Sequence, residues 1–193
     1  MPDARDTPDT LADLRDRGAR RMALLIAGLA ALLAVIQTIG DNAAQDALKF
    51  NIDASNLWSF YQAKTIRQTS VRTAAELLEL DLEAAPPERK EAVGKRLQTW
   101  QATVARYESE PETGEGRKEL VARAKAAEEA RDRALATDNM YDVASAALQL
   151  AIVLASASVV IGVTWLAWAA GGLGVLGLVF AILGWFAPTL IPI

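Results

Sequence analysis

Residues 143–193 read VASAALQLAIVLASASVVIGVTWLAWAAGGLGVLGLVFAILGWFAPTLIPI, a stretch of 51 residues without one Asp, Glu, Lys or Arg. A membrane-spanning helix needs roughly 20 predominantly apolar residues, so this stretch is long enough for two spans. Residues 22–40, MALLIAGLAALLAVIQTIG, are also uncharged and are long enough for one span. The sequence therefore predicts an all-α membrane protein with three transmembrane helices. One lies at 22–40 and a second at 143–169, while a third, with a short C-terminal tail, occupies 170–193.

The composition narrows the classes of function. The chain is 52% hydrophobic and 23% charged, and these figures coexist because the charges are segregated from the apolar stretches. It contains no Cys and no His, which excludes disulfides, thiolate nucleophiles, Ser-His-Asp triads and most zinc, haem and iron–sulfur sites. The net charge of −4 comes without any clustered basic excess, so nucleic-acid binding is not expected. We expect a protein without enzymatic activity, catalytic residues, cofactor or metal site.

Polar segments surround the first span. Residues 1–21 form a polar N-terminal tail, whose start is expected to be unstructured and to become helical from about Thr10. Residues 41–142 are expected to form an extramembrane helical region. No Pro or Gly occurs from Asn42 to Ala84, so the first span can continue directly into a long helix.

Two prolines then divide the extramembrane region. Pro86-Pro87 ends the long helix, because a proline disfavours the α conformation of the residue before it. A second helix is predicted at Pro87–Glu108, followed by a loop over residues 110–116. A third helix begins at Arg117 and feeds the second span without a break. The result is a helical hairpin or bundle with a thin core, which buries little apolar area. Packing against another copy or a partner would bury more and stabilise the region.

Small residues form a stripe on each C-terminal span. Steps of three and four keep each stripe on one face of its helix, and close backbone approach over small residues holds helices together in lipid. Ala170-Gly171-Gly172 is predicted to be the tight turn between the two spans. The helix-packing positions are Ala151, Ala155, Ser158 and Gly162 in the second span, and Gly174, Gly177, Ala181 and Gly184 in the third.

The spans contain no ionisable residue, which argues against a pump or an ion-coupled transporter. Gln37 and Gln149 are the polar side chains that could line a pore or join subunits, although both also suit an ordinary position near the membrane interface. Acidic residues beside the 110–116 loop could hold Ca²⁺, but no calcium-binding spacing is present, and a solvated acidic face is the simpler interpretation.

The charges beside the spans predict an orientation. Four Arg residues lie within seven residues before the first span, whereas Lys49 is the nearest basic residue after it. By the positive-inside rule the N-terminus is cytoplasmic and the helical region lies across the membrane. Trp165 and Trp168 are then expected at one interface, with Tyr141 and Trp185 at the other. A cleaved signal peptide is the alternative, but the first apolar run is longer than the roughly 7–15 residues of such peptides.

Two segments carry a family resemblance. One follows the first span and contains Trp58-Ser-Phe-Tyr61-Gln-Ala-Lys64, and the other, residues 148–156, opens the second span. With the arrangement of one span plus two, they resemble the bacterial membrane family called domain of unknown function 4337, over roughly residues 22–187. The absence of His from the middle region is a departure from that family. The resemblance implies a bacterial membrane protein of this architecture, and it implies no activity. Together with the orientation predicted from the charges, we expect a bacterial inner-membrane protein with a periplasmic helical region.

Trp58, Tyr61 and Lys64 share one helix face by their spacing. We expect them to pack the helical hairpin or to meet a neighbouring subunit. The leading functional hypothesis is a non-catalytic membrane scaffold or accessory protein that forms a homo-oligomer or binds another membrane protein. The alternative is a small homo-oligomeric channel lined by uncharged polar residues such as Gln37 and Gln149.

Overall fold

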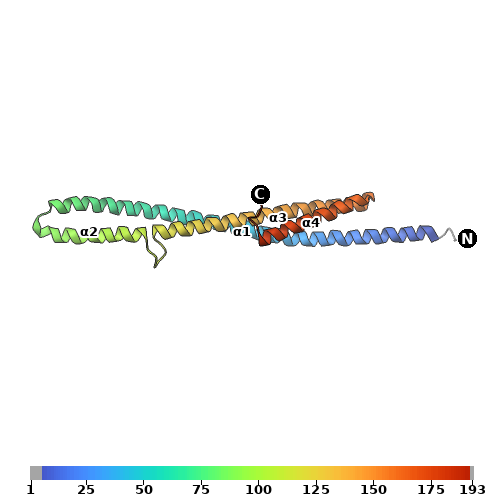
Figure 1. Cartoon of the computed structure of the whole chain (residues 1–193), viewed down its shortest axis with the longest axis horizontal. Coiled ribbons are helices and arrows are strands. Elements are labelled where there is room, and N and C mark those ends of the chain that lie inside the picture. Colours follow the sequence, from blue (N-terminus) through green and yellow to red (C-terminus); the bar gives the residue numbers. More distant parts are fainter. Residues whose placement is uncertain (1–5, 192–193) are drawn as a thin grey trace. The chain divides into compact units, whose positions relative to one another are not determined.

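The computed structural model describes the backbone of residues 6–191 and the side chains of residues 18–191. Four helices account for nearly all of this part of the chain, and none of the described residues lies in a strand (Figure 1). They are α1 (Asp6–Ala84), α2 (Pro87–Glu108), α3 (Arg117–Ile161) and α4 (Thr164–Phe186). Three of the four, α1, α3 and α4, are long and apolar enough to cross a membrane by length and composition.

Helix α1 runs through 79 residues without interruption. It begins at Asp6, four residues before the predicted start at Thr10, and the predicted unstructured beginning, residues 1–5, lies outside the described residues. The helix ends at Ala84, before Pro86, and Pro87 occupies the first turn of α2. Proline is favoured there because its missing N–H needs no partner in a first turn.

The chain divides into two compact units, which are described separately. The apolar unit comprises Met1–Ala47 and Asp132–Ile193, and the polar unit comprises Leu48–Arg131. Helices α1 and α3 each contribute to both units, whereas α4 belongs to the apolar unit and α2 to the polar unit.

In the apolar unit, large side chains of α1 pack into a surface of small residues. Leu29 and Ile36 of α1 are buried in one cluster with α3 residues that include Ala144, Leu148 and Ala151. On α3, the predicted packing positions Ala151, Ala155 and Ser158 are all buried. The small-residue face of α1, in contrast, is exposed: Ala23, Ala27, Ala31, Ala34 and Thr38.

The glycines of α4 permit its close approach to both other helices. A Cβ added at Gly174 would lie 2.9 Å from Leu29 Cδ2 on α1, and one at Gly177 would lie 3.0 Å from the backbone oxygen of Ala144 on α3. Gly184 is also buried, whereas Ala181 is partly buried beside the core cluster. The stripe of α4 is therefore occupied by helices of its own chain.

The turn between α3 and α4 differs from the predicted position. It lies at Gly162 and Val163, not at Ala170-Gly171-Gly172, which are inside α4. Gly162 has φ +76°, a left-handed conformation that glycine adopts at little cost. Its N–H donates to the Ser158 carbonyl at 2.9 Å, and the Ser158 hydroxyl donates to the Val163 carbonyl at 3.0 Å. Gly162 is thus an exposed turn residue and not a packing position.

The two ends of the apolar unit differ in how their helices meet. At one end, Gly18 and Met22 of α1 line a pocket together with Gly162 of the turn and Thr164 of α4. At the other end, Tyr141 lies against Gly40 and Gly184. Tyr141 is only 2% exposed, so its predicted place in an aromatic belt at the surface is wrong. Gly184 makes room for its ring inside the unit, and Gly40 makes room for its Cβ.

Few apolar side chains are buried in the polar unit. Those described as buried are Ala54, Ala75, Leu97, Leu120 and Ala124, of which only two are large. The hydrophobic contribution of so thin a core is small, so the unit depends on polar contacts to fix its helices.

Candidate functional site

The family-like element on α1 lies in the polar unit, where it meets α3. Trp58 Nε1 donates a hydrogen bond to Glu128 Oε1 at 2.9 Å. The Trp58 and Tyr61 rings meet edge to face, with centroids 5.7 Å apart. Tyr61 also lies under the guanidinium of Arg117, 5.1 Å from the ring centroid. Among the two roles expected for these residues, the described contacts correspond to packing of the helical hairpin.

Lys64 is a buried cation, only 5% exposed. Its ammonium lies 3.5 Å from Glu110 and 3.9 Å from Glu115, both in the segment between α2 and α3. The rings of Phe60 and Tyr107 each lie 5.6 Å from the same ammonium. A buried charge is tolerated where opposite charges and aromatic faces replace water, and Lys64 therefore holds the segment after α2 against α1.

Gln68 and Arg117 form the centre of a second group of polar contacts. Arg117 Nη1 donates to Gln68 Oε1 at 2.6 Å and to Glu108 at 2.8 Å, while its other nitrogens donate to Thr65 and Tyr61 at 3.0 Å. Gln68 is 2% exposed and donates to Glu108 at 3.0 Å and to the Val104 carbonyl at 3.1 Å. Every hydrogen-bonding group of the buried amide is thus satisfied.

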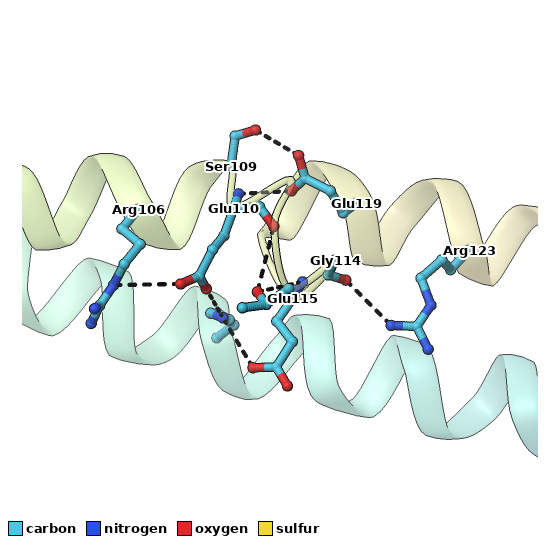
Figure 2. Close-up of polar contacts among 9 residues, drawn as sticks. Arg106, Ser109, Glu110, Gly114, Glu115, Glu119 and Arg123 are labelled. Carbon is cyan, nitrogen blue, oxygen red and sulfur yellow. Dashed lines mark hydrogen bonds and ion pairs between the residues drawn. The ribbon is translucent and has the colours of Figure 1, made fainter.

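The loop itself is closed by Glu119 at the start of α3 (Figure 2). The Ser109 hydroxyl donates to Glu119 at 2.6 Å, and the Glu110 backbone N–H donates to the same carboxylate at 3.2 Å. Gly116 is buried where an added Cβ would collide with Glu119, Glu110 and Ser109. We call the whole arrangement the junction cluster: Tyr61, Lys64, Thr65, Gln68, Glu108, Ser109, Glu110, Glu115, Arg117 and Glu119.

These contacts shift two carboxyl groups of the junction cluster. The pKa of Glu108 is lowered from its ordinary 4.5, chiefly by the Gln68 hydrogen bond and also by the charges of Arg117 and Lys118. The pKa of Glu119 is lowered chiefly by the Ser109 hydrogen bond. Both groups are anions at neutral pH and act as acceptors for their neighbours.

The contacts of the junction cluster join α1, the end of α2, the loop and the start of α3 within the polar unit. Among the described residues, no group of three acidic side chains is arranged to hold a metal ion, and the glutamates of the cluster already have partners within the chain. Sequence reasoning missed Gln68 and Arg117. A signal for Gln68 existed, since it continues the face of Trp58 and Tyr61 at helical spacing, but Arg117 joins that face from 49 residues further along the chain.

The structure brings the two predicted polar span residues, Gln37 and Gln149, into the wall of one cavity of about 520 Å³ in the apolar unit. Both side chains are exposed. The remaining wall is formed by Gly40, Asp41, Tyr141, Asp142, Ser145 and Ala146. We call this the acidic cavity.

A third carboxylate lies close to the acidic cavity. Burial raises the pKa of Asp138 from its ordinary 3.8, and the charges of Asp142 and Asp41 raise it further. Asp138 is therefore repelled by the charges of both Asp41 and Asp142.

Comparisons with known proteins identify a family and nothing more specific. The searches among curated proteins and among solved structures find no match. A family model, described as a domain of unknown function, matches residues 18–187. This range includes the junction cluster, the acidic cavity, helices α3 and α4, and α1 from residue 18 onward. The chain belongs to the family called domain of unknown function 4337 (DUF4337).

Proposed function

We propose that this protein is a non-catalytic membrane scaffold or accessory protein. The apolar parts of α1, α3 and α4 anchor it as three transmembrane helices in the inner membrane of a bacterium, and the polar unit is displayed outside the bilayer. The outer surface of the apolar unit supports the anchoring. Large apolar side chains such as Val160, Trp168 and Phe186 are at least 80% exposed, as suits side chains that face lipid.

The observation that carries the scaffold proposal is an apolar stripe on the polar unit. Five large side chains of α1 are at least half exposed: Leu48, Ile52, Ile66, Leu77 and Leu80. Their separations of 4, 14, 11 and 3 residues each approximate whole turns of a 3.6-residue helix, so all five lie on one side of α1. The stripe extends over about 48 Å at a rise of 1.5 Å per residue.

The opposite side of α1 is the one that packs within the polar unit. Ala54, Lys64, Gln68 and Ala75 are buried, and they fall about half a turn away from the stripe. Scattered exposed apolar residues are ordinary on a protein surface, whereas these five large side chains are aligned on one face of a single helix, which favours an interaction surface. The thin core of the polar unit gives a second reason for a partner. We infer that a helix from a second copy covers the stripe.

Removing the stripe tests this proposal. Ile66→Asn with Leu77→Asn is expected to convert a homo-oligomer into a monomer, as measured by native mass spectrometry of the full chain released from detergent. Arg67→Asn with Glu76→Asn is the matched control, because it alters the adjacent exposed positions and leaves the net charge unchanged. Co-purification of a different membrane protein, lost in the stripe variant, points to an accessory subunit. A monomeric wild type without any partner contradicts both forms of the proposal.

The orientation is proposed from the charges beside the first span, with the N-terminus cytoplasmic and the polar unit periplasmic. The absence of Cys from the sequence allows a direct test. Glu112→Cys places one thiol in the exposed loop between α2 and α3. A membrane-impermeant maleimide should label this variant in intact spheroplasts, and labelling only after lysis reverses the orientation.

A small homo-oligomeric channel is the second candidate. It is favoured by one observation, that Gln37 and Gln149 lie in the wall of the same cavity. Ion flux through the purified protein in liposomes, abolished by Gln149→Leu, is the expected result for a channel. Absence of flux in the wild type excludes it.

A further inference from the structure

The acidic cavity has features that neither scaffolding nor packing requires. Asp41 and Asp142 form part of its wall, and Asp138 is close enough to interact with both. Within residues 18–191, no ion pair joins any of these three carboxylates to a basic side chain. The described part of the chain thus brings three carboxylates, two of them exposed, near one another without pairing any of them with a basic side chain.

Ser145 provides an independent indication of a ligand. It is only 8% exposed and lies in the wall of the acidic cavity. No hydrogen bond to another described residue involves its hydroxyl. No enclosed polar side-chain atom in the described part of the chain lacks a partner, so the Ser145 oxygen keeps some accessible surface. Because Ser145 lies in the cavity wall, its hydroxyl is available to a ligand that fills the cavity.

The residues of the cavity wall indicate which class of cation the cavity could bind. The described acidic side chains do not converge closely enough for a metal ion, and about 520 Å³ is many times the ~30 Å³ that one water occupies in the liquid. The wall offers carboxylate, amide and hydroxyl oxygens, which accept hydrogen bonds from the three N–H groups of a primary ammonium. A quaternary ammonium prefers a cage of aromatic faces, and Tyr141 is the one aromatic residue in this wall.

The position of the cavity along the helices suits a ligand at a membrane surface. Asp41 and Asp142 lie just outside the uncharged stretches, whereas Gln37 and Gln149 lie within them. Gln149 is seven residues beyond Asp142, or about 10 Å along α3. The acidic cavity therefore extends from the charged boundary into the apolar part of the unit.

We propose that the acidic cavity binds a primary ammonium group, with Asp41 and Asp142 as its counter-ions and Ser145 as an additional acceptor. The group belongs either to the ethanolamine headgroup of a phospholipid or to a small soluble amine. This inference concerns a different unit from the stripe and does not require self-association, but its lipid form rests on the proposed membrane anchoring.

The test uses the full-length protein in nanodiscs of phosphatidylcholine alone or of phosphatidylcholine mixed with phosphatidylethanolamine. The two lipids differ in the ammonium group, which is quaternary in the first and primary in the second. The measurement is the thermal unfolding midpoint, which a ligand of the native state raises with its concentration. In a second arm, free ethanolamine is titrated into the nanodiscs of phosphatidylcholine alone.

A rise in the midpoint with phosphatidylethanolamine, with free ethanolamine, or with both supports the proposal, and the arm that responds identifies the source of the amine. Asp142→Asn should weaken the apparent affinity by about tenfold or more, because it removes a charged acceptor. Asp46→Asn is the control, since Asp46 is an exposed aspartate five residues after Asp41 that lines a different pocket. It should leave the affinity unchanged.

Ser145→Ala gives a second variant that removes the hydroxyl without altering charge. It should weaken the affinity about threefold, the size expected for one neutral hydrogen bond, and it remains informative if Asp142→Asn lowers the midpoint in phosphatidylcholine alone. The proposal is overturned if neither amine raises the wild-type midpoint. It is equally overturned if the rise is the same in wild type, Asp142→Asn and Ser145→Ala.

Discussion

Arg117 is the residue whose replacement should most weaken the polar unit. In Arg117→Met the aliphatic stem is kept and the guanidinium is lost. Gln68 is 2% exposed, so its amide oxygen loses a 2.6 Å partner that water cannot readily replace, at a cost of about 1–3 kcal/mol. Glu108 is partly exposed and recovers water, so its lost ion pair adds only about 0.5–1 kcal/mol. The Tyr61 and Thr65 contacts add about 1 kcal/mol together.

The expected total is about 2.5–5 kcal/mol, which corresponds to a population of the opened junction larger by roughly a hundredfold to a few thousandfold. Hydrogen exchange of the intact protein, followed by mass spectrometry, measures this population at amides such as those of Ser109, Gly114 and Leu120, which are hydrogen-bonded to backbone carbonyls. Arg123→Met is the matched control, because Arg123 is exposed and its contact is one 3.2 Å bond to the Gly114 carbonyl. Equal exchange in the two variants refutes the central role given to Arg117.

Three further predictions concern packing and pH. Gly177→Ala should lower the thermal midpoint, at a cost of about 1–3 kcal/mol for overpacking against backbone, whereas Gly172→Ala, with no atom within 4 Å of its added Cβ, should be neutral or stabilising. Asp138→Asn should raise the thermal midpoint at pH 7, because the native state disfavours the ionised carboxylate of Asp138. This gain should vanish below pH 3.8, the ordinary pKa of the group, where the wild-type carboxyl is protonated in both states. A gain that persists below pH 3.8 contradicts the raised pKa. The pKa values of Glu108 and Glu119 are lowered in the native state, so their ionised forms stabilise the polar unit above about pH 4.5. Acidification below that value should therefore increase hydrogen exchange at the junction cluster. The increase should be smaller in Glu108→Gln than in wild type, because that variant has one titrating carboxyl fewer.

The helix ends were predictable where the chemistry is local. Proline and the lack of glycine place the end of α1 at Ala84 and the start of α2 at Pro87, and the loop composition places the start of α3 at Arg117. The turn after α3 was not predictable in the same way. Glycine serves both as a turn residue and as a packing residue in apolar helices, and only the backbone geometry assigns the first role to Gly162 and the second to Gly174.

The candidate sites were predictable only in part, because both combine residues that are distant in the sequence. The spacing of Trp58, Tyr61 and Lys64 indicates a shared face, but it does not reveal that the partners come from the loop and from α3. Gln37 and Gln149 stood out as polar residues in apolar stretches. Their association with three aspartates depends on how α1 and α3 are aligned, and a single sequence carries no information on that alignment.

The length of α4 has a consequence for the kind of bilayer that suits this protein. Twenty residues separate Trp165 from Trp185, both exposed, which places their indole rings about 30 Å apart along the helix. Indole rings settle among lipid headgroups, and about 30 Å is the hydrocarbon thickness of a typical bilayer. A thicker membrane would bury one ring too deeply, and a thinner one would force the helix to tilt. With α4 anchored in a bilayer as proposed, the two tryptophans would favour membranes of about this hydrocarbon thickness.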